Sequence, residues 1–333
     1  MIKKLNRIVS TQPSNVLDIR FWPTDICDFD CTYCFPDSHP GVNRYPKNVD
    51  TVIKNFRTLF DVYTKKFNKT EFWINLVGGG EPTLWPHFNK FCREIKKEHN
   101  VQLKVTTNAS RTIRWWKDNV EYLDRATLSG HHEFMDVDHF MAVGDFLYEN
   151  NLNVGALMLM DCQHWDKCVA IVEKLKTSKQ PWIIEAKSIV QFPGKDIDSY
   201  TQEQIDYVAN TIKRVPDPEY ILKHIDDFNL FQSVALFNDG TATTMKSESY
   251  INNKWNYFND WTCHVPIENL VIVYDGTVTG SCNANIFKDA KINIFSETFK
   301  EDFEENAFDL KPIKCPYKVC DCLPDTHITK YIS

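Results

Sequence analysis

Between residues 16 and 214 the sequence alternates short apolar stretches with longer stretches of helical periodicity. The short stretches predict strands, and apolar residues spaced three and four apart predict helices between them. The predicted strands are 16–22, 71–77, 101–106, 125–129, 153–160 and 182–190, and the predicted helices are 50–66, 86–98, 111–123, 137–150, 165–177 and 201–214. Strand–helix repeats of this kind specify a parallel sheet with right-handed crossovers. Because these six repeats are two short of a closed eight-unit barrel, we predict an α/β fold with an open, partial (β/α)6 barrel.

The pattern changes after about residue 215, where Val215-Pro216-Asp217-Pro218 interrupts the last predicted helix. Two Asp-Gly pairs, Asp239-Gly240 and Asp275-Gly276, lie between β-rich segments and predict hairpins. A polar helix and a cysteine-rich tail follow. We therefore predict a barrel domain at 1–220 and a small C-terminal α+β, cysteine-rich domain at 221–333.

Composition restricts the class of protein. The net charge is −7, and the basic residues form no dense run, so nucleic-acid binding receives no support. The N-terminus lacks the apolar stretch of a signal peptide, and no run approaches the ~20 apolar residues of a membrane helix. Eleven cysteines in a chain without such a leader indicate metal binding in a reducing compartment rather than disulfides. We expect a cytoplasmic protein with no membrane partner.

Three cysteines, Cys27, Cys31 and Cys34, follow the first predicted strand with C-x3-C-x2-C spacing. Three thiolates this close can bind three irons of a cubic iron–sulfur cluster, and the fourth iron then stays open to a small ligand. A zinc site is the alternative, although zinc sites usually pair two cysteine clips or a clip with histidines. His39 would be the nearby fourth ligand of such a site.

Other polar residues follow later strands, at the ends where barrel chemistry occurs. Gly79-Gly80-Glu81-Pro82 ends the second strand, and its glycines permit close approach of a ligand or simply form a tight turn before a helix that starts at Pro82. Asn108 and Ser129 end the third and fourth strands, where they serve as ligand contacts or as caps. His131 and His132 come next, as solvated loop residues or as groups that face a substrate.

The cysteine spacing, Tyr33 before the third cysteine, and Gly79-Gly80-Glu81-Pro82 together resemble the radical S-adenosylmethionine (radical SAM) superfamily. The resemblance implies that a [4Fe-4S] cluster on the three cysteines chelates the amine and carboxylate of S-adenosyl-L-methionine. It also implies an electron donor such as flavodoxin or ferredoxin, which drives cleavage to a 5'-deoxyadenosyl radical. The cofactor-binding residues that it implies are Gly79, Gly80, Glu81, Asn108 and Ser129, with Ala109 where the family often has glycine.

Five cysteines occupy the C-terminal region: Cys263, Cys282, Cys315, Cys320 and Cys322. The first two bracket a predicted hairpin, an arrangement that resembles the start of the SPASM or shorter Twitch extensions of the same superfamily. A full SPASM module carries more cysteines, so the resemblance implies one auxiliary [4Fe-4S] cluster with one cysteine spare. Whether Cys320 or Cys322 is the ligand stays open. A structural zinc site is the alternative, because four thiolates also suit zinc.

The resemblance implies an enzyme that abstracts a hydrogen atom from a substrate carbon. An auxiliary cluster favours an oxidation, such as a dehydrogenation or a cross-link. Cys162, just past a predicted strand, is a candidate hydrogen donor, which would make the reaction an epimerisation; the alternative is a small buried side chain. Only about 15 residues precede the first predicted strand, which favours a small-molecule or separately delivered peptide substrate. A non-catalytic iron–sulfur or zinc scaffold is the remaining alternative.

Overall fold

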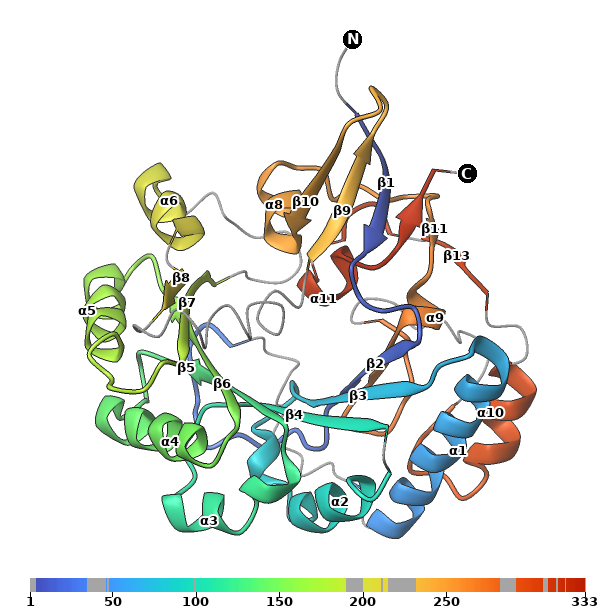
Figure 1. The fold of residues 1–333 in the computed structure, drawn as a ribbon, viewed down its shortest axis with the longest axis horizontal. Coiled ribbons are helices and arrows are strands. Elements are labelled where there is room, and N and C mark those ends of the chain that lie inside the picture. Colours follow the sequence, from blue (N-terminus) through green and yellow to red (C-terminus); the bar gives the residue numbers. More distant parts are fainter. Residues whose placement is uncertain are drawn as a thin grey trace.

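A computed structural model describes residues 4–34, 46, 48–98, 100–189, 200–210, 212–214, 232–281, 292–307, 311–315, 317–320 and 322–332. It contains a curved eight-stranded sheet with helices on its outer face and a smaller, six-stranded sheet beside one end (Figure 1). Both ends of the described chain lie at the smaller sheet (Figure 1). His39 lies outside the described residues, as does Cys282.

The eight-stranded sheet has the order β12-β2-β3-β4-β5-β6-β7-β8. Its strands are β2 (Val16–Phe21), β3 (Glu71–Leu76), β4 (Val101–Thr107), β5 (Arg125–Gly130), β6 (Asn153–Met160), β7 (Ile183–Ser188), β8 (Ile212–Arg214) and β12 (Asn269–Ile272). Neighbouring strands pair in parallel from β12 to β7, and only β8 runs antiparallel. The predicted α/β fold with a parallel sheet is confirmed.

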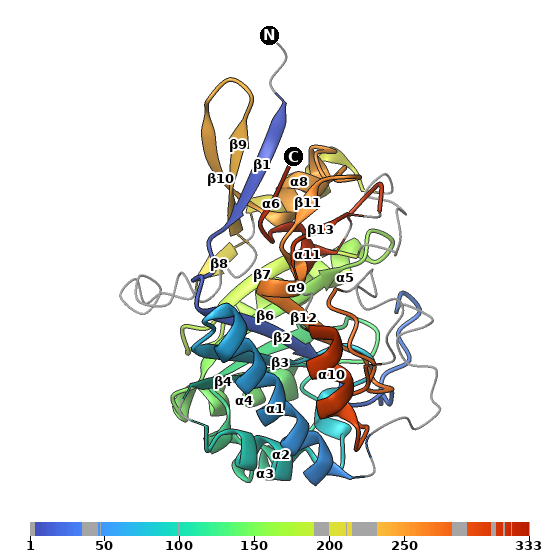
Figure 2. The same cartoon turned by 90° about the vertical axis from the view of Figure 1, so that its right-hand side faces the viewer.

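Helices connect the parallel strands and cover the convex face of the sheet (Figures 1 and 2). They are α1 (Val49–Phe67), η1 (Pro82–Leu84), α2 (Phe88–Ile95), α3 (Ile113–Lys117), η2 (Val120–Tyr122), α4 (Val137–Glu149), α5 (Trp165–Leu175) and α6 (Gln202–Asn210). Asn48 begins α1 by accepting hydrogen bonds from two backbone N–H groups, and Asn68 ends it with a left-handed φ of 54°. The predicted helix at 111–123 is two short helices, and the one predicted at 201–214 ends at Asn210, with β8 after it.

One strand of the eight-stranded sheet comes from far along the chain. β12 lies at the edge beside β2, and Leu270, Val271 and Ile272 are fully buried there. The sequence predicted a hairpin around Asp275-Gly276, and Thr279 N–H does return to the Val271 carbonyl at 2.8 Å. The sequence did not predict that the first strand of this hairpin extends the barrel.

The six-stranded sheet has the order β10-β9-β1-β14-β11-β13. Its strands are β1 (Leu5–Ser10), β9 (Gln232–Phe237), β10 (Ala242–Lys246), β11 (Thr262–Cys263), β13 (Ile313–Lys314) and β14 (Lys330–Tyr331). The short helices α8 (Ser247–Asn252), α9 (Val265–Glu268) and α11 (Leu323–Thr326) and the longer α10 (Phe299–Ala307) belong to the same part of the chain. The domain division at residue 220 stays a prediction, and two strands cross it, because β1 lies in the six-stranded sheet and β12 in the larger one.

The apolar core lies between the eight-stranded sheet and its helices. All six residues of β2 are buried, and successive side chains point to opposite faces. On the helix side, the Phe21 ring contacts Phe56 of α1, Trp85, and Phe91 of α2 at centroid distances of 5.3, 5.6 and 5.5 Å. Offset and edge-on aromatic contacts of this kind stabilise a core beyond their buried area.

The opposite face of β2 is polar. Asp18 and Arg20 form a buried ion pair with 3.2 Å between carboxylate and guanidinium. Asn75 of β3 donates to Asp18 at 2.7 Å, and Arg20 donates to Asn269 of β12. These hydrogen bonds join three neighbouring strands across the concave face. Among the described residues no helix combines the length and apolarity that crossing a membrane needs.

Candidate functional site

The loop after β2 carries Cys27, Cys31 and Cys34. Cys31 is buried, and the other two are half-buried. Burial raises the pKa of Cys27 to about 12 and that of Cys31 to about 11, and the nearby Cys34 adds to both shifts. Cys34 therefore lies within electrostatic range of both other thiols. A bound metal deprotonates a coordinating thiol outright, so this group fits a metal cluster in its donor chemistry.

The stretch after β3 is hydrogen-bonded directly to the cysteine loop. Gly80 N–H donates to the Thr24 carbonyl at 2.9 Å, and Glu81 N–H donates to the Ile26 carbonyl at 2.6 Å. A Cβ at Gly80 would lie 1.9 Å from the Ile26 carbonyl oxygen. Gly79 has a left-handed φ of 68°. Glycine is required here because the backbone of the cysteine loop lies against it.

The Glu81 carboxylate is buried and accepts four hydrogen bonds. Oε1 accepts from the Thr83 N–H at 3.0 Å, the Thr83 hydroxyl at 2.7 Å and the Thr107 hydroxyl at 2.8 Å, and Oε2 accepts from the Asn108 N–H at 2.7 Å. Burial raises the pKa of Glu81, and these hydrogen bonds oppose the shift. The side chain thus joins the C-terminal ends of β3 and β4.

Asn108 extends this network to the cysteine loop. Its amide Nδ2 donates to the Asp28 carboxylate at 2.8 Å and lies 4.0 Å from the Cys27 sulfur. Its Oδ1 accepts from the Ser110 N–H at 3.0 Å. Ala109, at the position where a glycine is common in the family, has a φ of 60°, the left-handed conformation that glycine favours. The turn keeps its shape although the residue differs.

Two histidines after β5 pack against Tyr33 of the cysteine loop. The Tyr33 ring stacks on His131 and on His132, with centroid distances of 6.0 and 5.5 Å. His131 Nδ1 lies 3.2 Å from the Tyr33 hydroxyl and 3.5 Å from the Cys31 sulfur. Burial lowers the pKa of His131 to about 4, so its imidazole is neutral at neutral pH. These histidines face the cysteine loop, which sequence reasoning did not foresee.

Ser129 and Cys162 occupy the ends of the next two strands. Ser129 is half-buried in β5, and Cys162 is half-buried two residues past β6. Cys92 and Cys168, by contrast, are fully buried in the core. The thiol of Cys162 lies near Tyr200, whose hydroxyl donates to the Met160 carbonyl at 2.5 Å. The hydrogen-donor role of Cys162 stays a prediction.

Comparison with known proteins agrees with this arrangement. Residues 23–144, which include the cysteine loop, Gly79–Pro82 and Asn108, match the model of the radical SAM superfamily. This part of the chain is similar to the radical SAM superfamily. GTP 3',8-cyclase of Klebsiella pneumoniae (strain 342) is 29% identical over 168 residues, which are 44% of this chain and 47% of that protein. The chain therefore spans about half the length of the curated relatives it matches.

Solved structures share the fold over more of the chain. "Native anSMEcpe with bound AdoMet and Kp18Cys peptide" covers 89% of this chain and 83% of its own, with a TM-score of 0.52 and 16% identity. The same protein with a Cp18Cys peptide covers 92% of this chain and 84% of its own, with a TM-score of 0.52 and 18% identity. At these identities the likeness shows a shared fold alone.

Beyond the residues that match the radical SAM model, the structure groups several tail cysteines. Cys263 ends β11, Cys322 immediately precedes α11, and Cys320 lies two residues before Cys322. All three are buried. Cys315 follows β13 and is half-buried. Burial raises the pKa of Cys263 to about 11 and that of Cys320 to about 12, and Cys315 and Cys263, respectively, add to these shifts. Cys263 therefore lies within electrostatic range of both Cys315 and Cys320.

A buried lysine, which sequence reasoning missed, lies among these thiols. Lys330 of β14 is 2% exposed, and its Nζ donates to the Asp325 carbonyl oxygen at 2.7 Å. Its Nζ also lies 4.5 Å from the centroid of the Phe258 ring. Burial alone lowers the pKa of Lys330, but Cys320 and Cys263 outweigh burial and raise it. A buried cation at this point suits a group that carries negative charge.

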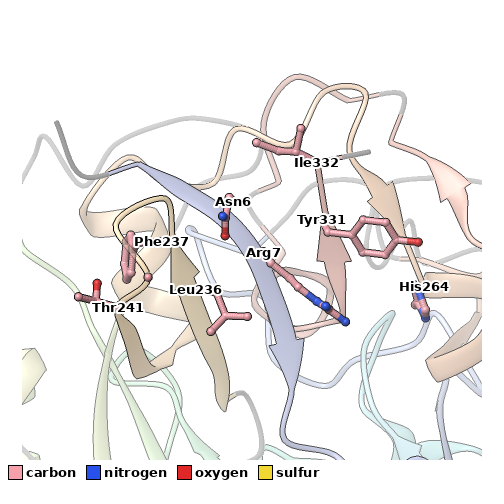
Figure 3. Close-up of a pocket in the computed structure, with 9 residues that line it drawn as sticks. Asn6, Arg7, Leu236, Phe237, Thr241, His264, Tyr331 and Ile332 are labelled. Carbon is pink, nitrogen blue, oxygen red and sulfur yellow. The ribbon is translucent and has the colours of Figure 1, made fainter. Parts of the chain in front are cut away.

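A cavity of about 900 Å³ opens between β1, β9 and β14 (Figure 3). Arg7, His264 and Tyr331 contribute to its lining, with the Arg7 guanidinium 5.6 Å from the Tyr331 ring centroid. None of the predicted site residues lines this cavity. The residues that match the radical SAM model lie instead at the C-terminal strand ends of the eight-stranded sheet.

Proposed function

We propose that Cys27, Cys31 and Cys34 hold a [4Fe-4S] cluster beside a binding site for S-adenosyl-L-methionine, in a radical SAM enzyme. The observation that carries this proposal is the direct hydrogen bonding between the cysteine loop and the Gly79–Pro82 stretch. Two distant motifs of one family thereby form a single site. When bound, the two cofactors supply a 5'-deoxyadenosyl radical that abstracts a hydrogen atom from a substrate carbon.

Backbone groups rather than the Glu81 side chain are the proposed contacts to the methionine part of the cofactor. Both carboxylate oxygens of Glu81 already accept hydrogen bonds from the protein. The left-handed φ angles of Gly78 and Gly79, 74° and 68°, turn the backbone without a Cβ in the way. Asn108 positions the cysteine loop through Asp28, and the half-buried Ser129 is the proposed contact at the next strand end.

An auxiliary [4Fe-4S] cluster, as in a Twitch-like or SPASM-like extension, is the proposed occupant of the tail site. Cys263, Cys315 and Cys320 would be three of its ligands, because Cys263 interacts electrostatically with each of the other two thiols. The fourth would be Cys282 or Cys322. The Lys330 ammonium beside them would balance the negative charge of a thiolate-ligated cluster.

We propose a small molecule or a separately delivered peptide as substrate, a flavodoxin or ferredoxin as electron donor, and the cytoplasm as location. An oxidation, such as a dehydrogenation or a cross-link, is favoured because a second cluster can accept an electron from the substrate. An epimerisation with Cys162 as hydrogen donor is the second candidate, since that thiol is half-buried at a strand end.

Iron and acid-labile sulfide in anaerobically purified protein test the two-cluster proposal. We expect about eight irons per chain, four for each cluster. Replacing Cys27, Cys31 and Cys34 with alanine should leave about half of the iron, because the tail site lies outside the loop. Replacing Cys263, Cys315 and Cys320 should leave the other half. Stoichiometric zinc without labile sulfide in the wild type would contradict the proposal.

A further inference from the structure

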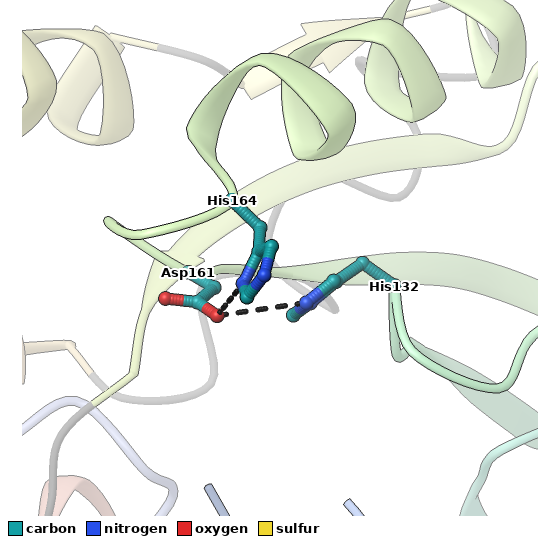
Figure 4. Close-up of side chains that lie close together, drawn as sticks. All are labelled: His132, Asp161 and His164. Atoms are coloured by element: carbon teal, nitrogen blue, oxygen red, sulfur yellow. Dashed lines mark hydrogen bonds and ion pairs between the residues drawn. The ribbon is translucent and has the colours of Figure 1, made fainter. Parts of the chain in front are cut away.

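Three side chains that no part of the proposed function uses come together after β5 and β6. Figure 4 shows that the imidazoles of His132 and His164 both face one carboxylate oxygen, Oδ2 of Asp161. This oxygen lies 2.7 Å from Nδ1 of His164 and 3.5 Å from Nε2 of His132. The two ring nitrogens and the oxygen all lie within 4.8 Å of one another.

The fold itself brings these residues together. β5 and β6 are neighbouring parallel strands, with Gly130 paired to Met158. The residues just past their ends therefore meet at one edge of the sheet. His164 immediately precedes α5, which returns along the outside of β6. The loop after β5 thus contributes His132, and the loop between β6 and α5 contributes Asp161 and His164.

A backbone hydrogen bond orients the Asp161 carboxylate. Its Oδ1 accepts a hydrogen bond from the Gln163 N–H at 2.9 Å, which turns Oδ2 toward the histidines. Such a backbone contact is the kind of outer support that metal-ligating carboxylates usually have.

His132 is buried without the partners that a buried imidazole needs. Its side chain is 1% exposed. Neither ring nitrogen has a hydrogen-bond partner among the residues that the structure describes. Leaving a buried polar group unsatisfied costs about 1–3 kcal/mol, so a partner is expected. Nε2 faces Oδ2 of Asp161 at 3.5 Å, an ion-pair distance rather than a hydrogen bond.

We propose that His132, Asp161 and His164 bind a divalent transition-metal ion, with Zn²⁺ as the ion best suited to them. Two imidazole nitrogens and one carboxylate oxygen are ordinary zinc ligands, with bonds of about 2.0–2.2 Å. A tetrahedral ion with such bonds separates its ligand atoms by roughly 3.4 Å. The 3.5 Å separation already matches, and the 2.7 Å contact has to open slightly.

Three protein ligands leave the fourth position of a tetrahedral zinc ion open. The His164 side chain is 55% exposed, so this position faces solvent. Water or a carboxylate or hydroxyl oxygen of a small molecule would occupy it. Tyr33 stacks on His132 with a centroid distance of 5.5 Å, which places the ion behind the aromatic residue of the cysteine loop.

Zinc binding to the full chain, with its iron–sulfur clusters in place, tests this proposal. The protein is equilibrated anaerobically with Zn²⁺ and desalted, and zinc per chain is measured by mass spectrometry, with affinity from competition against a chromogenic chelator. We expect one zinc in the wild type. His164→Ala and Asp161→Asn should each bind at least about 100-fold more weakly, since even the outer partners of ligands contribute 10–100-fold. His139→Ala is the matched control and should keep its zinc, because the His139 imidazole hydrogen-bonds the Arg111 carbonyl at 3.1 Å and is not part of the cluster.

X-ray absorption at the zinc edge identifies the ligands independently of folding or activity. The account expects nitrogen and oxygen neighbours at about 2.0–2.1 Å, with imidazole outer shells and no sulfur at about 2.3 Å. A sulfur shell would mean that zinc had entered a cysteine site. Equal zinc affinity in the wild type and in His164→Ala would show that the cluster is a hydrogen-bonded group only. Either result overturns the proposal.

Discussion

The placement of the cysteine loop depends on contacts between single residues at neighbouring strand ends. Gly80 accommodates the Ile26 carbonyl, and Glu81 receives the Asn108 N–H. Asn108 in turn donates to Asp28 inside the loop. Because Glu81 is buried and all these groups are satisfied, the network holds the loop in one position.

Gly80→Ala should disrupt this site without unfolding the rest of the chain. The new Cβ would meet a backbone carbonyl at 1.9 Å, and backbone cannot rotate away as a side chain can. We expect iron content to fall toward half, with the tail iron retained. Gly240→Ala is the control, because Gly240 has a φ of 82° and no heavy atom within 4 Å of a new Cβ. Gly240→Ala should lower the free energy of unfolding by about 1–2 kcal/mol and leave the iron content unchanged. Full iron in Gly80→Ala would show that the close contact is unimportant.

Cys162→Ala distinguishes the two proposed reactions. If the thiol donates a hydrogen atom, the variant should still form 5'-deoxyadenosine but should not incorporate solvent deuterium into the product. Mass spectrometry of the product in deuterated buffer measures this. Cys92→Ala, at a fully buried cysteine of α2, is the control and should incorporate deuterium normally. Unchanged turnover in Cys162→Ala would rule the role out and leave oxidation as the better proposal.

At the scale of elements, the C-terminal part of the chain adds an edge strand to the eight-stranded sheet. β12 pairs with β2, and α10 packs beside α1 (Figure 2). Asn55 of α1 donates to the Ile294 and Ser296 carbonyls at 2.9 and 2.8 Å. The sheet edge beside β2 is thereby covered, which protects it from pairing with other chains.

Tyr63→Phe tests how much the contact between α1 and α9 stabilises the fold. The Tyr63 hydroxyl is fully buried and donates to the Pro266 carbonyl at 2.7 Å. Removing it leaves that carbonyl without its donor, so the free energy of unfolding should fall by about 1–3 kcal/mol. Chemical denaturation of the apoprotein measures the change. Tyr317→Phe, at a side chain that is 40% exposed, should change stability by less than about 0.5 kcal/mol. Equal effects of the two substitutions would show that the hydrogen bond from Tyr63 to the Pro266 carbonyl contributes nothing to stability.

The sequence predicts the six strand–helix repeats closely because their apolar periodicity is strong. The strand predicted at 153–160 matches β6 residue for residue. β1 was missed because Leu5–Ser10 is a short strand whose only buried residue is Ile8. The place of β12 could not be foreseen, since pairing between residues 269 and 18 depends on distant parts of the chain.

For the site, the cysteines and glycines were found because their spacing is itself a signal. The groups around Lys330 and Asp161 were not found, because each includes a residue from far along the chain, Cys263 and His132 respectively. The buried Asn108, one of the predicted cofactor-binding residues, contacts Asp28, and no sequence spacing could indicate this contact. Contacts between strand ends are a property of the folded sheet.

At the scale of the whole molecule, two groups of thiols lie on different sheets. The loop cysteines follow β2 of the eight-stranded sheet, whereas Cys263 and Cys315 lie at β11 and β13 of the six-stranded sheet. This division predicts that the two sites can be emptied separately. The proposed cofactor cleavage belongs to the first site and the proposed electron acceptor to the second.

Formation of 5'-deoxyadenosine from S-adenosyl-L-methionine, under anaerobic conditions with dithionite, tests the central claim most directly. The wild type should form it, and so should a folded Cys263→Ala, Cys315→Ala, Cys320→Ala variant that no longer turns over substrate. Replacing Cys27, Cys31 and Cys34 with alanine should abolish it while tail iron remains. If that last variant still cleaves the cofactor, or if the iron-loaded wild type does not, the assignment of the cysteine loop as the catalytic cluster site is contradicted.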